Sequence, residues 1–400
     1  MSKISGTEKF DSLGEIPKSA IAPNPCNRAW VEVDSKAIEN NSRKLKKFIK
    51  EDCLLMAVVK ADGYGHGAET VAKAALIGGA DSLGVATLEE GIELRKVGLD
   101  CQILILGNLT NWEELYSCLL WRLIPTISAI REAIICNNIA EKYKKKFVIH
   151  LKVDTGMTRL GCNIDEVNEI LYKIDRLRNL SLEGIYSHLA LADHNSAGCN
   201  KSKNFTQMQR NRFINILNNL GKRKEELCCH LSNSAGTLSD NSLHFDMVRV
   251  GLSLYGYSPI TNFNANLNLK PALKVKARIA FIRDVPKGTG VGYGHIFTTQ
   301  RKSRLAVVAI GYADGVSRAL SGKISVIVDG SFVPQIGAIA MDQMVLDITD
   351  KPNIKVGKTV TILGSEGDLI ISPHQWGALS GSIPWEVLCS FKHRLPRVVI

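Results

Sequence analysis

The segment MAVVKADGYGHG, residues 56–67, places a lysine between an apolar run and a glycine-rich run. An ammonium group at the end of a buried strand costs free energy unless it is paired or loses its proton. One interpretation is that the amine of Lys60 reaches solvent, as strand-end lysines usually do. The other is that partial desolvation lowers the pKa of the amine, which then attacks an aldehyde to form a Schiff base. Gly63, Gly65 and Gly67 allow close backbone approach and favour the second interpretation without excluding the first.

Polar residues that could share a site with Lys60 follow other apolar runs along the chain. Asp154, His188 and the segment 232–234 each come directly after a run that is predicted as a strand. The carboxyl ends of the strands form one face of a parallel barrel, and that face holds the chemistry in barrel enzymes. We therefore expect these side chains to gather near Lys60.

Short apolar runs alternate with helical patterns between about residue 36 and residue 260. Two of the helical patterns, at 86–98 and 204–221, place apolar residues on one face and end at a glycine. The runs predicted as strands are 54–59, 82–86, 102–106, 123–127, 147–153, 182–187, 227–231 and 245–250. Eight strands, with no GxGxxG motif after the first, favour a (β/α)8 TIM-type barrel over an open doubly wound sheet.

After about residue 270 the pattern changes to strands joined by short turns, with little helical signal before residue 372. The chain is therefore predicted to be a barrel followed by a mostly β C-terminal domain. We divide it into a flexible N-terminal leader at 1–27, a barrel region at 28–265 and a β domain at 266–400. The early strand at 29–34 is a candidate for joining the β domain, which would make that domain discontinuous in sequence.

The composition excludes several classes of protein. Hydrophobic residues make up 45% and charged residues 22%, and no apolar run reaches the roughly 18 residues of a membrane span. The net charge of +11 is interpreted as scattered lysines, because basic runs such as 142–146 lack the interleaved aromatic residues of a nucleic-acid platform. The ten cysteines form no CxxC pair and the N-terminus lacks a signal-peptide core. We expect reduced thiols, no metal, no nucleic-acid or membrane partner, and a cytoplasmic location.

The chain resembles the alanine racemase family from about Arg28 to Arg397, almost its whole length. Eight motifs appear in the family order: AVVKADGYGHG, HLKVDTGMTRLG, YSHLALAD, SNSAGTL, FDMVRVGLSLYG, VGYGHIFT, IGYADG and AMDQ. The resemblance implies a barrel and a β domain, the cofactor pyridoxal 5'-phosphate (PLP), and an isomerase that interconverts L-alanine and D-alanine. It also implies that the D-alanine supplies peptidoglycan.

The resemblance implies catalytic residues as well. Lys60 would hold PLP as a Schiff base and move the proton on the D-face of the substrate, and Tyr293 would act on the L-face. A tyrosine is a poor base at its usual pKa of about 10, so it needs cationic neighbours, which His188 and Arg249 fit by type. Arg249 would also face the pyridine nitrogen of PLP. Since arginine only donates hydrogen bonds, it would leave that nitrogen unprotonated.

Residues that contact the cofactor and the substrate follow from the same motifs. The resemblance assigns the cofactor contacts to Lys60, Tyr64, His188, Asn233, Ser234, Arg249, Gly251, Leu252 and Tyr312. It assigns the substrate carboxylate to Arg159, Met341 and Asp342. In many relatives the lysine that matches Lys152 is carbamylated and orients the arginine that matches Arg159.

Tyr293 lies in the predicted β domain, whereas Lys60 and Arg249 lie in the predicted barrel. In the family such residues meet across a dimer interface, so the resemblance implies a homodimer with shared sites. His393 stands where the family has a tyrosine at the site entrance, which leaves a racemase of broader specificity as an alternative. A fold-related PLP decarboxylase of a basic amino acid is a second alternative. Those enzymes usually face the ring nitrogen with an acidic residue, whereas this chain offers Arg249.

Overall fold

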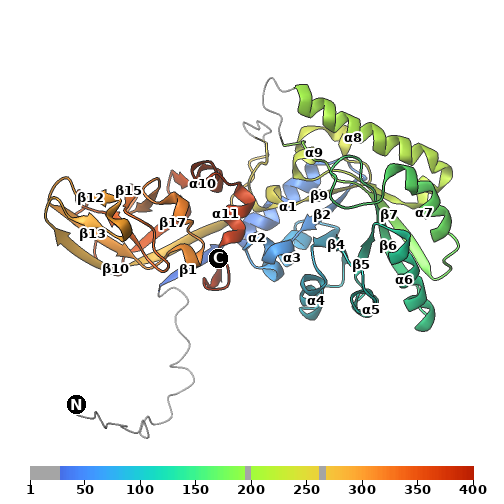
Figure 1. Ribbon diagram of the computed structural model, residues 1–400, viewed down its shortest axis with the longest axis horizontal. Coiled ribbons are helices and arrows are strands. Elements are labelled where there is room, and N and C mark those ends of the chain that lie inside the picture. The colour runs from blue at the N-terminus through green and yellow to red at the C-terminus, as the bar shows by residue number, and fades with distance from the viewer. Residues whose placement is uncertain (1–27, 194–199, 261–266) are drawn as a thin grey trace, which may run out of the picture.

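Eight parallel strands close into a barrel in the computed structural model of the chain, as predicted (Figure 1). The structure describes residues 28–193, 200–260 and 267–400, and the predicted leader at 1–27 lies outside them. The strands are β2 (Leu54–Val58), β3 (Ser82–Val85), β4 (Gln102–Asn108), β5 (Ile124–Ile127), β6 (Phe147–Lys152), β7 (Leu180–Tyr186), β8 (Cys228–His230) and β9 (Met247–Val250). Strand β2 pairs with both β3 and β9, which closes the ring.

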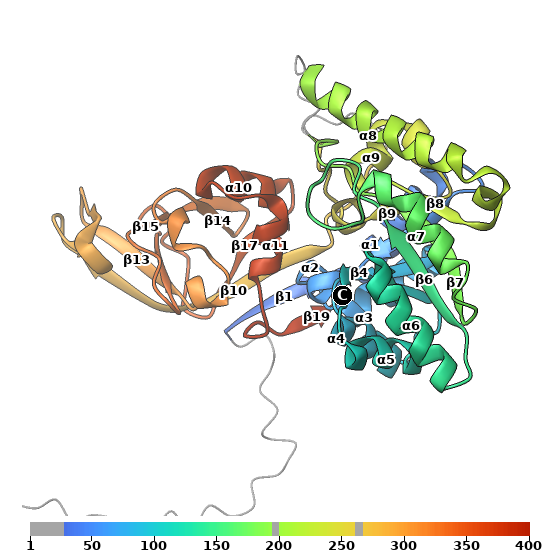
Figure 2. The same ribbon diagram turned by 45° about the vertical axis from the view of Figure 1, so that its right-hand side comes forward.

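Helices surround the barrel strands, so that the apolar runs of the strands are buried on both faces. In Figure 2, α8 lies along one side of the barrel and α4, α5 and α6 lie on the opposite side. Helix α4 begins where Thr87 and Glu90 form a capping box, and it buries Leu88 and Leu94 against the core. The helices are α1 (Ser35–Phe48), α2 (Lys60–Tyr64), α3 (Ala68–Ile77), α4 (Leu88–Lys96), α5 (Trp112–Leu120), α6 (Ile130–Lys142), α7 (Val167–Ile174), α8 (Asn200–Asn219) and α9 (Ser234–Ser239).

The second domain is a nine-stranded sheet in the order β18-β17-β14-β15-β16-β13-β10-β1-β19, with β17 also pairing with β10. Its strands are β1 (Ala29–Val33), β10 (Leu273–Val285), β13 (Ser303–Val308), β14 (Ser325–Val328), β15 (Ser331–Ile336), β16 (Met344–Asp347), β17 (Thr359–Glu366), β18 (Leu369–Ile371) and β19 (Arg397–Val399). A separate two-stranded sheet joins β11 (Gly290–Val291) to β12 (Phe297–Thr298). Helices α10 (Pro373–Ser380) and α11 (Pro384–Ser390) lie on the barrel side of this domain (Figure 1).

The early strand β1 belongs to the C-terminal sheet. It runs antiparallel to β10, with Val31 opposite Val275, and parallel to β19, with Val31 opposite Arg397. From residue 28 on, the chain therefore runs through the β sheet, forms the barrel, and returns to the sheet. This connection joins the two domains at both ends of the barrel sequence.

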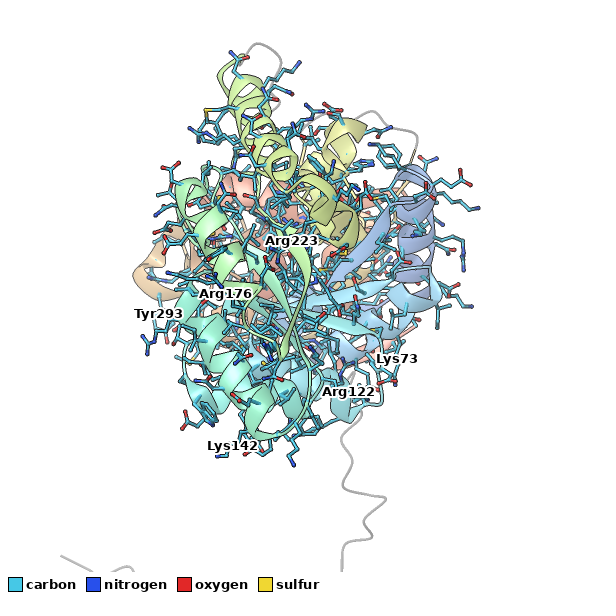
Figure 3. All side chains as sticks on the ribbon, turned by 90° about the vertical axis from the view of Figure 1, so that its right-hand side faces the viewer. Lys73, Arg122, Lys142, Arg176, Arg223 and Tyr293 are labelled. Carbon is cyan, nitrogen blue, oxygen red and sulfur yellow. The ribbon has the colours of Figure 1, made fainter. Side chains whose placement is uncertain are left out.

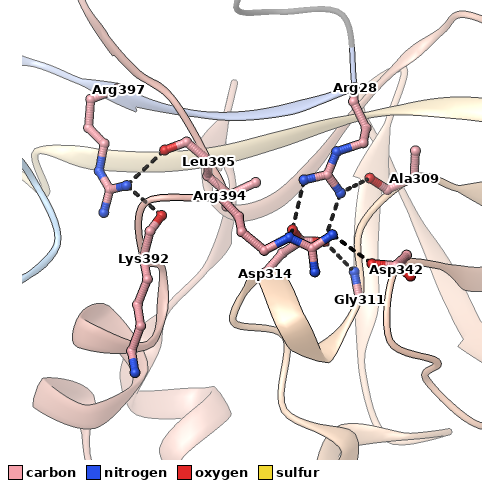
Figure 4. A network of polar contacts seen from close by, with 9 residues as sticks. All are labelled: Arg28, Ala309, Gly311, Asp314, Asp342, Lys392, Arg394, Leu395 and Arg397. Carbon is pink, nitrogen blue, oxygen red and sulfur yellow. Dashed lines mark hydrogen bonds and ion pairs between the residues drawn. The ribbon is translucent and has the colours of Figure 1, made fainter.

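A buried carboxylate ties the start of the chain to the C-terminal domain (Figure 4). Asp314 is 1% exposed and accepts from Arg28 through both carboxylate oxygens, at 2.8 and 2.7 Å. Arg394 contacts the same carboxylate at 3.4 Å and donates to Asp342 at 2.6 Å. A bidentate arginine–carboxylate pair is among the stronger polar contacts in proteins. The network thus fixes the position of the segment that contains Asp342.

Basic side chains are spread around the barrel rather than gathered on one face. Lys73 pairs with Glu69 at 2.6 Å, and the Lys142 amine lies 5.7 Å from the centre of the Trp112 ring. None of the helices in the described ranges is long and apolar enough to cross a membrane. Figure 3 shows that five basic side chains of the barrel lie apart from one another: Lys73, Arg122, Lys142, Arg176 and Arg223.

Candidate active site

Lys60 lies directly after β2, at the carboxyl end of the barrel strands, and opens a turn of unusual handedness. Residues Ala61 to Tyr64 all have positive φ, between 51° and 59°, which forms a left-handed turn. This conformation costs about 1–2 kcal/mol per non-glycine residue. The side chain of Glu90 holds the turn by accepting from the backbone nitrogen of Ala61 at 2.6 Å. Strain of this kind concentrates at functional sites, where the surrounding structure maintains it.

Tyr64, Ser234 and Gly251 converge beside this turn from three different barrel segments. A Cβ atom on Gly251 would lie 2.5 Å from the Tyr64 hydroxyl oxygen, so only glycine fits there. The Ser234 Oγ accepts from the backbone nitrogen of Gly251 at 2.9 Å, and Leu252 follows fully buried. Burial raises the pKa of Tyr64 well above its usual value, so its hydroxyl keeps its proton and can donate. Asn233 caps helix α9 by accepting from the backbone nitrogen of Gly236.

Arg249, on β9, is buried and fully engaged by hydrogen bonds. Its Nη1 donates to Nδ1 of His230 at 2.8 Å, and its Nη2 donates to the backbone oxygens of Ser187 and Leu231 at 2.7 and 3.0 Å. The Nη2 also lies 3.3 Å from Nδ1 of His188. Burial lowers the pKa of Arg249 to about 10, so the group stays charged at neutral pH.

His188 is neutral in this environment. Burial holds the pKa of His188 well below its usual value, and the charge of Arg249 lowers it further. The expectation from the residue type was a cationic neighbour for a tyrosine base. Only Arg249 of the two supplies positive charge, because the imidazole cannot gain a proton next to a buried guanidinium.

Four cations face the same space at the mouth of the barrel. Burial lowers the pKa of Lys152 to about 8, and Arg249, Arg159 and Lys60 lower it further. Burial also lowers the pKa of Lys60, again with Arg159 adding to the effect, while the carboxylate of Glu90 opposes it. The loop that presents Arg159 is folded by Asp154, whose Oδ1 accepts from the backbone nitrogens of Gly156 and Met157 at 2.8 Å each. Such a site attracts anionic groups and favours a neutral amine.

The predicted site residues of the β domain lie apart from the mouth of the barrel. Tyr293 is 72% exposed and lies between β11 and β12, and Figure 1 shows β12 at the end of the β domain far from the barrel. Tyr312 and Met341 are also exposed, and the backbone nitrogen of Tyr312 donates to the oxygen of Ala340 at 3.0 Å. Within the described ranges, no hydrogen bond or ring contact joins Tyr312 to Tyr64 or its neighbours. Within one chain, the predicted site residues of the β domain therefore do not join those at the mouth of the barrel.

Known protein families match the chain in two parts. The profile described as the N-terminal domain of alanine racemase matches residues 33–259, and the profile described as its C-terminal domain matches residues 272–399. The alanine racemase of Prochlorococcus marinus is 59% identical over 377 residues, which are 94% of this chain and 97% of that protein. The chain belongs to the alanine racemase family. As a racemase, it is an isomerase.

Solved alanine racemases share this fold. The enzyme of Clostridium difficile has a TM-score of 0.86 and 34% identity, covering 93% of this chain and 96% of that one. The enzyme of Bacillus anthracis, solved with bound L-Ala-P, has a TM-score of 0.86 and 33% identity, covering 95% and 96%. The enzyme of Bartonella henselae, solved with covalently bound pyridoxal phosphate, has a TM-score of 0.82 and 30% identity, covering 93% and 99%.

Some residues that shape this racemase site were not singled out from the sequence. Glu90 is part of a Thr-x-x-Glu capping box, which is a readable helix start, but its bond to Ala61 depends on the barrel bringing α2 and α4 together. Tyr255 stacks on Tyr64 with ring centres 4.7 Å apart, and its hydroxyl donates to the oxygen of Val58. Nothing local in the sequence indicates these long-range contacts.

Gly65 joins the lysine turn of the racemase barrel to the β domain. A Cβ atom there would lie 2.5 Å from the backbone oxygen of Leu388 in α11, and the Gly65 oxygen accepts from Nε of Arg397 at 3.0 Å. Gly67 also has positive φ but has nothing within 4 Å of its Cβ position.

We expect Gly65→Ala to lower the free energy of unfolding by about 2 kcal/mol more than Gly67→Ala, because only the first adds a steric clash to backbone strain. Urea unfolding of the two variants measures this difference. Equal destabilisation would show that the close approach to Leu388 is unimportant.

Proposed function

We propose that this alanine racemase uses PLP and moves the Cα proton between two bases, Lys60 on the D-face and Tyr293 on the L-face, to supply D-alanine for peptidoglycan. The observation that carries the proposal is the amine of Lys60, whose pKa is lowered by burial and by Arg159 at the mouth of the barrel. A lowered pKa increases the fraction of neutral amine, which is the form that binds an aldehyde covalently and accepts a proton.

The residues present fit PLP. Tyr64 and Ser234 offer hydroxyl donors to a phosphate, and Gly251 lets the Tyr64 hydroxyl lie where a Cβ would clash with it. Lys60 would anchor the aldehyde carbon, and the predicted contacts Asn233 and Leu252 directly adjoin Ser234 and Gly251 in the chain. When bound, PLP withdraws electrons from the substrate Cα and makes its proton acidic. The covalently bound pyridoxal phosphate in the Bartonella henselae relative supports this assignment.

Arg249 is the group that we place against the pyridine nitrogen. Its guanidinium donates every hydrogen bond that it makes, and it stays charged at neutral pH. It can therefore donate a hydrogen bond to the ring nitrogen without transferring its proton, so that nitrogen stays unprotonated. By leaving the ring nitrogen unprotonated, Arg249 would favour return of the proton to Cα over side reactions such as transamination.

The second base comes from another copy of the chain in this proposal. Tyr293 is exposed at the far end of the β domain and is not near Lys60 of its own chain (Figure 1). A homodimer that places each β domain over the barrel of the partner would bring the two bases together. The same arrangement would deliver the exposed Met341 and Tyr312 to the partner's site. In that setting Tyr293 would meet the cationic mouth of the barrel.

The substrate carboxylate is assigned to Arg159, with the Met341 backbone and Asp342 nearby. Arg159 is exposed at the mouth of the barrel, where a planar guanidinium can bind a carboxylate through two hydrogen bonds. Lys152 carries a carbamate in this proposal. Its pKa of about 8 provides the neutral amine that adds carbon dioxide, with release of one proton, and the resulting anion is stabilised by Arg159 and Arg249.

We expect planar density beyond Nζ of Lys152 in a high-resolution crystal map, in contact with Arg159. The variant Lys152→Ala should raise the KM for alanine roughly tenfold with a smaller effect on kcat, because the arginine loses an orienting partner. Lys173→Ala, an exposed lysine paired with Glu169, is the matched control. An unmodified ammonium in the map would contradict the carbamate.

A direct assay tests the function and its alternatives together. The purified protein is incubated separately with L-alanine, L-serine and L-lysine, and the D-enantiomers and amine products are measured. We expect D-alanine as the main product and no amine. Comparable D-serine formation would favour broader specificity, for which the exposed His393 at the predicted entrance is the motivating residue. Amine without a D-amino acid would support the decarboxylase alternative and overturn the proposal.

A further inference from the structure

A line of hydrogen bonds crosses the barrel interior beneath the proposed cofactor site. Arg249 on β9 donates to Nδ1 of His230 on β8 at 2.8 Å. The Nε2 of His230 lies 3.2 Å from Nδ1 of His150 on β6. Both histidines are buried, and Tyr186 stacks on the His230 ring with centres 4.5 Å apart and planes 6° from parallel.

The direction of this line is set by Arg249. A guanidinium only donates, so Nδ1 of His230 must accept and the hydrogen of a neutral His230 must sit on Nε2. That hydrogen is then donated to Nδ1 of His150, which leaves the His150 hydrogen on its own Nε2. Burial lowers the pKa of His150 to about 4 and holds that of His230 well below its usual value, and Arg249 adds to both effects. Both rings are therefore neutral, each in a single tautomer.

The barrel makes specific room for the His150 ring. A Cβ atom on Gly184, in the neighbouring strand β7, would lie 2.5 Å from both Cε1 and Nδ1 of His150. Gly184 does not have positive φ, so its backbone alone does not call for glycine. The pairing of β6 with β7 also shifts register between Ile149 and His150. The barrel therefore accommodates the His150 ring at two points, through the glycine and through the register shift.

The other end of the line reaches the opposite end of the barrel. His150 lines a cavity of about 190 Å³ whose walls come from the first residues of several strands, including Leu54, Ser82 and Met247. A cavity of this size holds water, which can accept from Nε2 of His150. The line of hydrogen bonds that begins at Arg249 can therefore end at water, so that Nε2 of His150 is not left without a partner.

We propose that His150 is a positioning residue for the racemase reaction. It accepts a hydrogen bond from His230 and thereby holds His230 in the tautomer whose Nδ1 accepts from Arg249. That hydrogen bond orients the guanidinium of Arg249 toward the cofactor ring. The inference rests on the proposed placement of Arg249 against the pyridine nitrogen. Without His150, the hydrogen of His230 can move to Nδ1, where it opposes the hydrogens of Arg249. The guanidinium then loses one of the hydrogen bonds that orient it, and keeps those to the backbone oxygens of Ser187 and Leu231.

Two substitutions of similar size separate this role from core packing. His150→Asn keeps an acceptor near the position of Nδ1, whereas His150→Leu fills the site without one. We expect His150→Leu to lower kcat roughly tenfold with little change in KM and to raise the pyruvate released per D-alanine, as transamination competes better. His150→Asn should restore most of kcat and the low pyruvate ratio. If His150→Leu fails to fold, Gly184→Ala serves in its place, because its methyl group displaces the same ring.

A second readout does not depend on turnover. In holoenzyme labelled with 15N-histidine, ring-nitrogen shifts report the tautomers of His230 and His150, assigned through the His150 variants. We expect Nε2–H for both rings in the wild type, and for His230 in His150→Asn but not in His150→Leu. A protonated Nδ1 on His230 in the wild type, or unchanged kcat and pyruvate ratio in His150→Leu, would overturn the inference. Absent racemisation in the wild type would instead count against the proposed function, and the tautomer result would stand apart from it.

Discussion

Lys60→Ala is expected to lower kcat/KM for alanine racemisation by at least about 10⁴-fold, the largest effect of any single substitution in the barrel. One side chain is proposed to do two things, which are covalent anchoring of the cofactor and proton transfer on the D-face. General-base catalysis alone contributes about 10²–10⁴-fold, and loss of the anchor adds to this. The rate of D-alanine formation from L-alanine measures the loss.

The structure supplies a matched control and a rescue experiment for this variant. Lys73→Ala removes an exposed lysine from α3 that is paired only with Glu69, so its activity should remain close to that of the wild type. A small primary amine in solution should restore part of the activity of Lys60→Ala, because it can replace the missing base. Activity of Lys60→Ala above about one hundredth of the wild type would assign proton transfer to another residue.

The barrel was predictable because each strand is a short apolar run bounded by polar or turn residues. The observed strands differ from the predicted ones only at their ends, as when β7 begins at Leu180 rather than at residue 182. Such ends depend on pairing with neighbouring strands, which a single run does not encode. The left-handed turn from Ala61 to Tyr64 was not predictable from local preference, since it is maintained by Glu90 from another helix.

The candidate site divides in the same way. Lys60 and His188 could be grouped from sequence because both follow barrel strands, and such ends share one face, whereas Arg249, inside β9, was assigned only through the family resemblance. The protonation state of His188 could not be predicted from the sequence, because it depends on burial beside Arg249. The hydrogen bonds through His150 could not be predicted from the sequence either, because they form only when β6, β7 and β8 lie side by side. Long-range packing sets charge states and orientations that residue type alone leaves open.

Tyr293→Phe is expected to lower racemisation in both directions by about 10³-fold, because each turnover needs a proton acid on one face and a base on the other. The change removes one hydroxyl from a side chain that is 72% exposed in the single chain, so folding should be unaffected. Tyr172→Phe makes the same chemical change at another exposed tyrosine, on α7, and should keep full activity. Initial rates from L-alanine and from D-alanine measure the effect.

Heterodimers of Lys60→Ala and Tyr293→Phe subunits decide whether the second base comes from the partner. If each site combines Lys60 of one chain with Tyr293 of the other, one site of the heterodimer carries both lesions and the other carries none. Heterodimers purified through two different tags should then show about half of the wild-type activity per dimer, although each parent homodimer is nearly inactive. If both bases came from one chain, each site would carry one lesion and the heterodimers would stay inactive. The exposed position of Tyr293, far from its own barrel, favours the first outcome (Figure 1).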